Sequence, residues 1–512
     1  MSSVQHRALS GSISNVAGIG SLFLQNIVIV PVMLHRWGGE LYGVWIAINA
    51  VQSLIQTIDT GKENYLGNEF NRLYHTDRPR LERLLSTGLC SILILGPLQV
   101  LLVLALRSGS MLGRLLGINL NPATQNSVWL ALLALVVGWI LSGSVGGLVI
   151  RLTYAVGYYA RFNWWGVLQR VLLIVGMVVA VERGAGLVAV SVIFGSIQIV
   201  TNAAMMVDMF FILRRFGIRL RAPSLSLAVS AFGKSLLLTG ASLLDNASTS
   251  GLFTLVAALF SAAVLPMFST LRTLANVAMQ CVTTIMNPLF PEMSRYNARN
   301  EIDKLNEMTS VCWLVTGPLV NAGLLCSILF VEPLYALWTH GKLPFQRDLF
   351  LLLALGVCLK SIGSPWYNYL ICTNSIKGQW WVTFMRGAIV LGATYALATS
   401  AGLRSAGIAV VSAELVASLL LPLFFTQREF QRRGYSIPWR SFWLAFSSVL
   451  TVAASFAVFA ARLTSPEVPV ALGMAAIGLL AIAQWRTLSE ETRARLISLV
   501  TRERKGAALP AV

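Results

Sequence analysis

The sequence predicts an all-α polytopic membrane protein that crosses the bilayer about 14 times. Of its 512 residues, 56% are hydrophobic and only 12% are charged, with a mean hydropathy of +0.71. A soluble domain carries about 25% charged residues. Apolar runs of about 20 residues, the length that one spanning helix needs, recur along the whole chain. These runs are continuously apolar rather than alternating, which favours helices over the strands of a barrel.

The expected spanning helices follow these runs, and the connections between them are too short to hold a soluble domain. In chain order the expected helices lie at 12–34, 42–61, 87–106, 127–150, 164–181, 187–212, 235–258, 265–290, 310–331, 348–371, 382–402, 405–426, 441–461 and 468–484. The domains that this order predicts are an N-terminal six-helix lobe at 1–222, a C-terminal six-helix lobe at 223–436, and helices 13 and 14 with a basic cytoplasmic tail at 437–512.

The net charge of +18 reflects topology rather than nucleic-acid binding. Most of the 39 Lys and Arg residues fall in connections on the side of the N-terminus, among them 67–85, 214–221 and 428–433. Such a bias is the positive-inside pattern of membrane proteins. We therefore expect a multi-pass membrane protein with both termini in the cytoplasm and no nucleic-acid partner; the bacterial cytoplasmic (inner) membrane is the location that the family resemblance given below implies.

Two pairs of short patterns indicate an internal repeat. The stretch NEFNRL at 68–73 resembles PEMSRY at 291–296, so that Glu69 matches Glu292 and Arg72 matches Arg295. A second pair, NWWGVLQR and QWWVTFMR, ends at Arg170 and Arg386. Six expected helices separate the members of each pair, and an even number preserves orientation. Two six-helix lobes related by a parallel pseudo-two-fold axis, with two appended C-terminal helices and a central cavity, are therefore predicted.

Four cations in the apolar runs are candidate substrate-binding residues. An ionisable group in the bilayer costs about 2.5–3.5 kcal/mol on insertion scales, so each needs a reason to be there. Arg170 and Arg386 follow a Trp pair that marks the headgroup level. They either snorkel back to it or offer forked donors to a phosphate. Arg272 and Lys360 lie deeper in their runs and favour an anionic headgroup in the cavity.

Three carboxylates in the apolar runs are candidate ion-coupling residues. Asp245 lies among small polar residues and Glu414 among apolar ones. Such carboxylates can carry a proton, or they can pair with the cations named above. Asp59 is expected at the end of the helix at 42–61, where an ordinary boundary carboxylate is the favoured interpretation.

Catalytic, metal and cofactor chemistry is not expected. The sequence contains no GxxxxGK[ST] loop, and the six Cys residues form no CxxC pair or metal-ligand spacing. The four His residues all fall in expected tails or loops. The outward segments, about 107–126 and 332–347, are short for a membrane-embedded sugar polymerase. The sequence thus predicts a transporter rather than an enzyme.

Two stretches resemble bacterial polysaccharide flippases of the Wzx type, which handle O-antigen or exopolysaccharide units. Residues 34–61 are similar to the N-terminal signature of that family, with Asp59 and Gly61 in its Asp-x-Gly positions, and residues 271–296 are similar to its eighth helix. The resemblance covers the chain through about residue 430. It implies the multidrug/oligosaccharidyl-lipid/polysaccharide exporter (MOP) superfamily, with two six-helix lobes and alternating access.

The resemblance also implies a substrate and partners. The flippase branch moves an undecaprenyl-diphosphate-linked oligosaccharide from the inner to the outer leaflet, often with coupling to an ion such as H⁺ or Na⁺. A polysaccharide polymerase and a chain-length regulator are partners only by family analogy. In this interpretation Arg272 and Lys360, with Arg170 and Arg386 at the entrance, attract the diphosphate, while Asp245 and Glu414 sense a counter-ion.

Two rival transport functions stay open. A multidrug or cation antiporter of the same superfamily predicts an acidic cavity, which the excess of Arg and Lys in the spans disfavours. A peptidoglycan lipid II flippase fits the two appended helices, although its expected charged first helix is missing.

Overall fold

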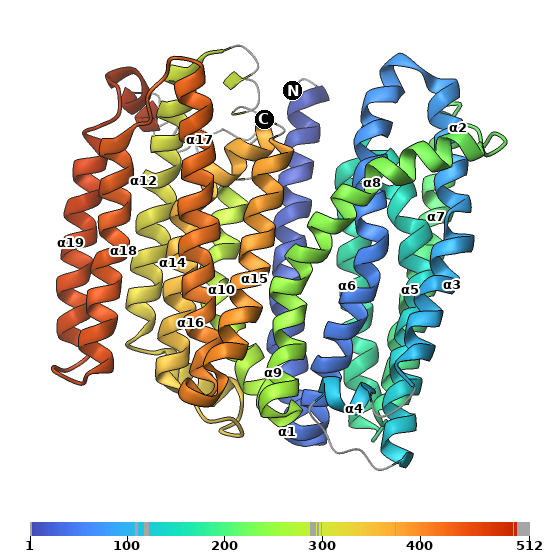
Figure 1. Ribbon diagram of the computed structural model, residues 1–512, viewed down its shortest axis with the longest axis horizontal. Helices are drawn as coiled ribbons and strands as arrows, with labels where there is room; N and C mark the ends of the chain where they lie inside the picture. Colours follow the sequence, from blue (N-terminus) through green and yellow to red (C-terminus); the bar gives the residue numbers. More distant parts are fainter. Residues whose placement is uncertain are drawn as a thin grey trace, which may run out of the picture. The chain divides into compact units, whose positions relative to one another are not determined.

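The computed structural model is helical throughout the residues that it describes (Figure 1). These residues are 3–107, 111–116, 122–156, 158–286, 293, 296–297, 300–373, 375–494 and 496–498. No strand occurs among them, which confirms the predicted all-helical class. The repeat partners Glu292 and Arg295 fall outside this part of the chain.

The first half of the chain contributes ten α-helices with a π-helical and a 3₁₀ segment between the last three. In order they are α1 (Ser3–Thr76), α2 (Arg78–Cys90), α3 (Ile92–Ala105), α4 (Met111–Leu116), α5 (Pro122–Ala155), α6 (Tyr159–Glu182), α7 (Leu187–Arg215), α8 (Leu225–Asn246), the π-helix η1 (Ala247–Gly251), α9 (Leu252–Phe260), the 3₁₀-helix η2 (Ala262–Val264) and α10 (Leu265–Met286).

The second half continues the pattern with one further π-helical segment. Its elements are α12 (Ile302–Ser327), α13 (Val331–Trp338), α14 (Arg347–Cys372), α15 (Ile376–Ala401), α16 (Arg404–Ala413), the π-helix η3 (Glu414–Leu420), α17 (Leu421–Arg432), α18 (Trp439–Ala460) and α19 (Glu467–Trp485).

Thirteen helical stretches of the described chain are long and apolar enough to span a membrane, so the protein is a multi-pass membrane protein. The first, Ile13–Tyr74, has 62 residues, or about 93 Å of helix at ~1.5 Å per residue. A bilayer core is only about 30 Å thick. Gly38 breaks the stretch with φ 70° and ψ 179°. The ribbon of α1 reverses direction within its length (Figure 1). Two crossings in α1 would bring the total to the expected 14.

The chain forms two compact units. Unit 1 comprises Met1–Thr270, Tyr335–Pro344 and Val390–Ala406, and unit 2 comprises Leu271–Leu334, Phe345–Ile389 and Gly407–Val512. The domain boundaries expected from the repeat, at 222/223 and 436/437, remain a prediction.

Unit 1 has an apolar core where the end of α1 meets α2, α5 and α7. Leu66 and Phe70 of α1 are buried there with Leu84 of α2, Leu148 of α5 and Met209 of α7. The start of α2 is fixed by its N-cap, because the side chain of the residue before it, Asp77, accepts a hydrogen bond from the Arg80 amide at 3.1 Å. This packing holds the polar stretch of the sequence at 67–85 in helical form.

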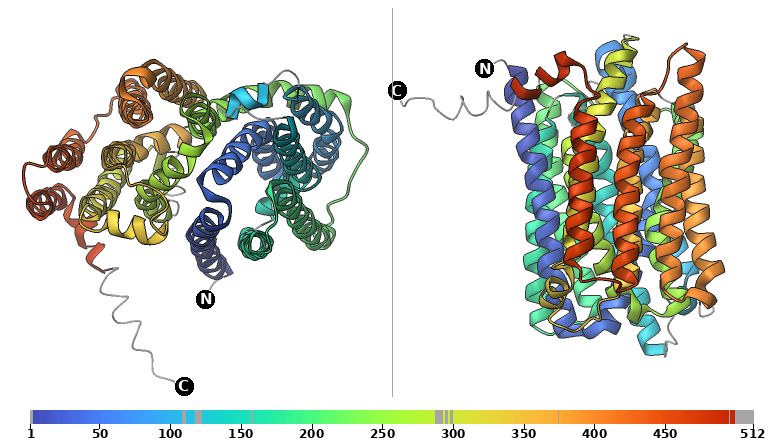
Figure 2. Two further views of the ribbon diagram at one scale, coloured as in Figure 1. Left: turned by 90° about the horizontal axis from the view of Figure 1, so that it is seen from below. Right: turned by 90° about the vertical axis from the view of Figure 1, so that its left-hand side faces the viewer.

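Unit 2 is organised around Trp313 of α12, which is fully buried. Its indole nitrogen donates to the Ile362 carbonyl of α14 at 2.8 Å, and its ring meets Trp366 edge-on with centroids 5.0 Å apart. The pair α18 and α19 lies side by side (red in Figure 2) and packs on α12. There Asn321 donates to Ser448 at 2.6 Å.

Candidate functional site

A buried carboxylate in unit 2 is surrounded by cations. Glu414 opens the π-helix η3 and is 8% exposed. Ser418, one turn later, donates a hydrogen bond to Glu414 Oε2. Arg386 of α15 donates from Nη2 to Ser418 Oγ at 2.8 Å, and its Nε lies 3.7 Å from the same Glu414 oxygen. The hydroxyl therefore bridges the guanidinium and the carboxylate.

Two further cations act on the same carboxylate. Arg272 of α10 and Lys360 of α14 join Arg386 as the positive groups whose fields reach Glu414. The three cations and the carboxylate all lie in candidate membrane spans. We refer to these four residues as the cationic cluster.

Small residues of α14 bring η3 close to that helix. A Cβ at Gly363 would lie 1.8 Å from the Ser418 carbonyl oxygen, and one at Gly356 would lie 3.9 Å from Glu414 Cγ. Only glycine permits the contact at position 363, because any side chain would overlap the η3 backbone. π-Helical turns are rare and occur often at functional sites.

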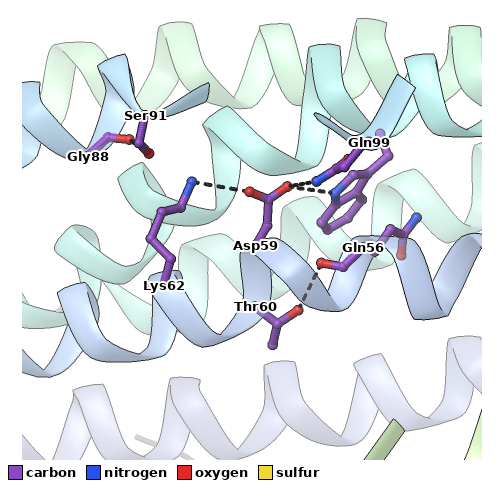
Figure 3. A network of polar contacts seen from close by, with 8 residues as sticks. Gln56, Asp59, Thr60, Lys62, Gly88, Ser91 and Gln99 are labelled. Carbon is purple, nitrogen blue, oxygen red and sulfur yellow. Dashed lines mark hydrogen bonds and ion pairs between the residues drawn. The ribbon is translucent and has the colours of Figure 1, made fainter. Parts of the chain in front are cut away.

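Unit 1 contains a second buried polar network, centred on Asp59 (Figure 3). Asp59 Oδ1 accepts from Lys62 Nζ at 3.2 Å. Its Oδ2 accepts from Gln99 Nε2 of α3 at 2.7 Å and from Trp139 Nε1 of α5 at 3.3 Å. Asp59 is fully buried within α1, which stays helical to Thr76. The expectation that Asp59 ends its helix was wrong, because the polar residues after it face other helices rather than water.

Glu63 extends this network and was not singled out from the sequence. It is 7% exposed, and its Oε1 has no hydrogen-bond partner among the described residues. The charged groups acting on it are Asp59 and Lys62 of its own helix and Arg151 of α5. Its carboxylate lies against Gly147 of α5, where a Cβ would come within 2.4 Å of it. The signal for Lys62 and Glu63 was present in the polar run DTGKEN at 59–64.

The remaining predicted residues, Arg170 and Asp245, lie in unit 1, whereas the cationic cluster lies in unit 2. Arg170 of α6 is half-buried and donates from Nη1 to the Gly18 carbonyl at 2.5 Å and to Ser21 Oγ at 3.1 Å. Asp245 is exposed just before η1. Its neighbour Asn246 instead points to α1 and donates to Thr57 Oγ1 at 2.5 Å. Within unit 2 the structure brings Arg272, Lys360 and Arg386 near Glu414, and Arg170 and Asp245 belong to unit 1.

Metal-ligand groups are missing from the residues that the structure describes. Among them, no group of three or more His, Cys, Asp or Glu side chains lies close enough to hold a metal ion. Cys90, Cys312, Cys326 and Cys358 are free thiols.

Comparison with known proteins identifies the fold. No family model and no curated protein matches the sequence. Among solved structures, the inward closed conformation of the lipid II flippase MurJ has a TM-score of 0.62 at 12% identity, over 93% of this chain and 99% of that chain. An outward-facing multidrug resistance MATE family transporter of the MOP superfamily has a TM-score of 0.58 at 16% identity, over 84% and 97%.

A third solved structure belongs to the same group. A MOP superfamily transporter from Pyrococcus furiosus has a TM-score of 0.59 at 16% identity, over 82% of this chain and 95% of that chain. The chain therefore has the fold that the MurJ and MATE family structures share.

Proposed function

We propose that the protein is a flippase that carries an undecaprenyl-diphosphate-linked oligosaccharide from the inner to the outer leaflet of the bacterial cytoplasmic membrane by alternating access. The observation that carries this proposal is the cationic cluster. Its three cations in spanning helices suit an anionic substrate group.

The electrostatic argument rests on the three cations. An anion that enters a medium of low dielectric needs cationic partners, and the three cations of the cluster can act as such partners. A diphosphate is such an anion, and an Arg guanidinium binds phosphate oxygens through parallel hydrogen bonds. Without substrate, Glu414 holds Arg386 in position through Ser418. In this proposal the diphosphate replaces Glu414 as the anionic partner of the cations.

A lipid II flippase is the second candidate. The MurJ structure aligns with 93% of this chain, whereas the MATE family transporter aligns with 84%. A lipid II flippase would use the same cluster for a similar lipid-linked headgroup. A multidrug or cation antiporter is less well supported, because three cations surround the one buried carboxylate of the cluster.

Ion coupling by H⁺ or Na⁺ belongs to the same proposal. The residues proposed for it are Asp59, Asp245 and Glu414. Arg170, which contacts the α1 backbone, is proposed to bind substrate only at the entrance.

The first test asks which leaflet holds the lipid-linked oligosaccharide in a deletion strain. A membrane-impermeant sugar label is applied to intact cells and to inverted vesicles. Accumulation on the inner leaflet, reversed by the wild-type gene, supports flipping. Normal leaflet distribution and normal surface polysaccharide, together with altered drug sensitivity, would move the assignment to the antiporter.

The second test compares variants in the complemented strain. Arg272→Ala and Lys360→Ala should lower transport about ten-fold or more, since each removes a charge-assisted contact worth roughly 1.5–3 kcal/mol. Lys377→Ala is the matched control, because Lys377 is an exposed cation on α15, the helix of Arg386. Equal membrane levels are confirmed by immunoblot. Wild-type transport by both cluster variants would remove these residues from the site.

A further inference from the structure

A cavity of about 750 Å³ lies within unit 1, between α1, the α2–α3 pair and the start of α8. Its walls are mainly apolar and include Leu66 of α1, Leu84 of α2, Ile94 of α3, and Val229 and Phe232 of α8. Its volume falls in the range of about 300–1,000 Å³ that is usual for ligand sites.

The cavity is open on a side that exposes apolar side chains. Three of its wall residues have large exposed fractions, 73% for Ile94, 68% for Val229 and 57% for Phe232. Ile94 belongs to the candidate span Arg78–Ala105, whereas Val229 and Phe232 precede the candidate span Thr239–Phe260. An apolar opening beside a membrane span suits the entry of a hydrocarbon chain.

A built polar rim lies at the end of the cavity where α2 and α8 begin. The backbone amide of Arg219 donates to Glu82 Oε1 at 3.0 Å, and Arg221 Nε donates to Glu82 Oε2 at 2.6 Å. The Ser224 amide donates to Thr87 Oγ1 at 3.0 Å. These bonds fix the segment before α8 along α2, with Thr87 and Ser224 in the cavity wall.

The rim is strongly basic. The segments 77–90 and 214–221 carry seven arginines against two carboxylates, Asp77 and Glu82; the arginines are Arg78, Arg80, Arg83, Arg214, Arg215, Arg219 and Arg221. Arg83 is exposed and lies one helical turn from Thr87, on the same face of α2. The positive end of the α8 dipole adds to the field at this rim.

We propose that this cavity binds an anionic phospholipid, with an acyl chain between α1, α3 and α8 and the phosphate at the arginine rim. Hydrocarbon walls that end at a cationic rim match the two halves of such a lipid. Basic segments at a membrane surface attract anionic lipids. The site lies wholly in unit 1, whereas the cationic cluster lies in unit 2.

Photo-crosslinking of the full-length protein tests the site. The probe is phosphatidylglycerol with a diazirine near the end of one acyl chain, at trace level in phosphatidylcholine nanodiscs. Mass spectrometry should place adducts in 84–95 and 223–235. Unlabelled phosphatidylglycerol should reduce these adducts, whereas added phosphatidylcholine or inorganic phosphate should not.

Two variants test the acyl-chain cavity and the phosphate contact separately. Ala228→Trp should fill the cavity and abolish the adducts, whereas Val200→Trp on the lipid-exposed face of α7 should leave them unchanged. Arg83→Gln should weaken competition by phosphatidylglycerol about five-fold, and Arg183→Gln, at an exposed position after α6, should not. A rise in melting temperature with added phosphatidylglycerol, lost in Ala228→Trp, gives a second readout.

The remaining outcomes would overturn the proposal. Equal labelling of wild type and Ala228→Trp, or adducts spread evenly over lipid-exposed residues, would mean bulk lipid contact only. Displacement by undecaprenyl phosphate but not by phosphatidylglycerol would assign the cavity to the isoprenoid chain. The readout is lipid binding and not transport. A failure of the flippase proposal would therefore leave the proposal of a phospholipid site unaffected.

Discussion

At the residue scale, the Asp59 network shows how a membrane unit holds charges. Asp59 is compensated by an ion pair with Lys62 and by two neutral donors, Gln99 and Trp139. A buried carboxylate persists only when it is paired and hydrogen-bonded. Glu63 departs from this rule, because its Oε1 has no hydrogen-bond partner among the described residues.

Removing the Asp59 charge should destabilise the protein. Asp59→Asn leaves the Lys62 ammonium buried without its counter-charge, a loss of about 3–5 kcal/mol for a broken buried pair. We expect a lower midpoint of thermal unfolding in detergent. Adding Lys62→Met should recover part of the loss, because it removes the ammonium that Asp59→Asn leaves without its partner. Asp303→Asn, at an exposed position of α12, is the control and should leave the midpoint unchanged. An equal midpoint for Asp59→Asn and wild type would contradict the prediction.

A methyl group at Gly147 should collide with Glu63. Because the added Cβ would lie 2.4 Å from that carboxylate, Gly147→Ala should lower the free energy of unfolding by about 1–3 kcal/mol. In the background of Glu63→Ala the same substitution should cost much less, which a double-mutant cycle on thermal midpoints measures. Strictly additive effects would show that the two residues do not touch.

At the element scale, the chain departs from regular α-geometry at two π-helical segments, η1 and η3, which lie beside polar contacts between helices. The π-helix η3 presents Glu414 and Ser418 together toward Arg386. The π-helix η1 follows Asn246, which bonds to α1. A wide turn changes which side chains share a face, so the regular 3.6-residue period of the sequence does not predict these groupings.

The kink in α1 should depend on glycine. Gly38 has φ 70° and ψ 179°, a conformation essentially restricted to glycine, so Gly38→Ala should cost about 1–3 kcal/mol. Gly20 of the same element has no atom within 4 Å of an added Cβ. Gly20→Ala should therefore be neutral or stabilising by about 0.5–1 kcal/mol. Thermal unfolding of the two purified variants compares them. Equal effects would argue against the kink.

At the scale of the whole molecule, the parity of crossings fixes the topology. The thirteen candidate spans of the described chain include one of 62 residues with a kink at Gly38. If that stretch crosses twice, the crossings are even in number and both termini lie on one side. The basic connections then fall on that same side, which the positive-inside rule assigns to the cytoplasm.

Reporter fusions test this topology. Alkaline phosphatase, which is active only after export, should be active when fused after Gly39 and inactive when fused after Thr76. A green fluorescent protein at the C-terminus should fluoresce, because it folds in the cytoplasm. Phosphatase activity at Thr76 would show that the second part of α1 does not return across the membrane.

The cationic cluster was partly predictable. Arg272, Lys360, Arg386 and Glu414 each stood out because charges are rare in apolar runs. Their assembly was not predictable, since they come from α10, α14, α15 and η3 and meet only through packing. Arg170 carries the same local pattern as Arg386, yet it contacts the α1 backbone. Local sequence therefore does not distinguish the two roles.

The sequence alone determined that hydrocarbon surrounds the spanning segments and that the secondary structure is helical. Hydrocarbon forces every backbone group of a spanning segment to bond internally, so long apolar runs can only be helices. Which charges pair depends on contacts between helices that are far apart in the sequence, and these follow from side-chain shape. The close approach of Gly363 to the Ser418 carbonyl and the burial of Asp59 against α3 and α5 are such contacts. Only the tertiary structure could decide them.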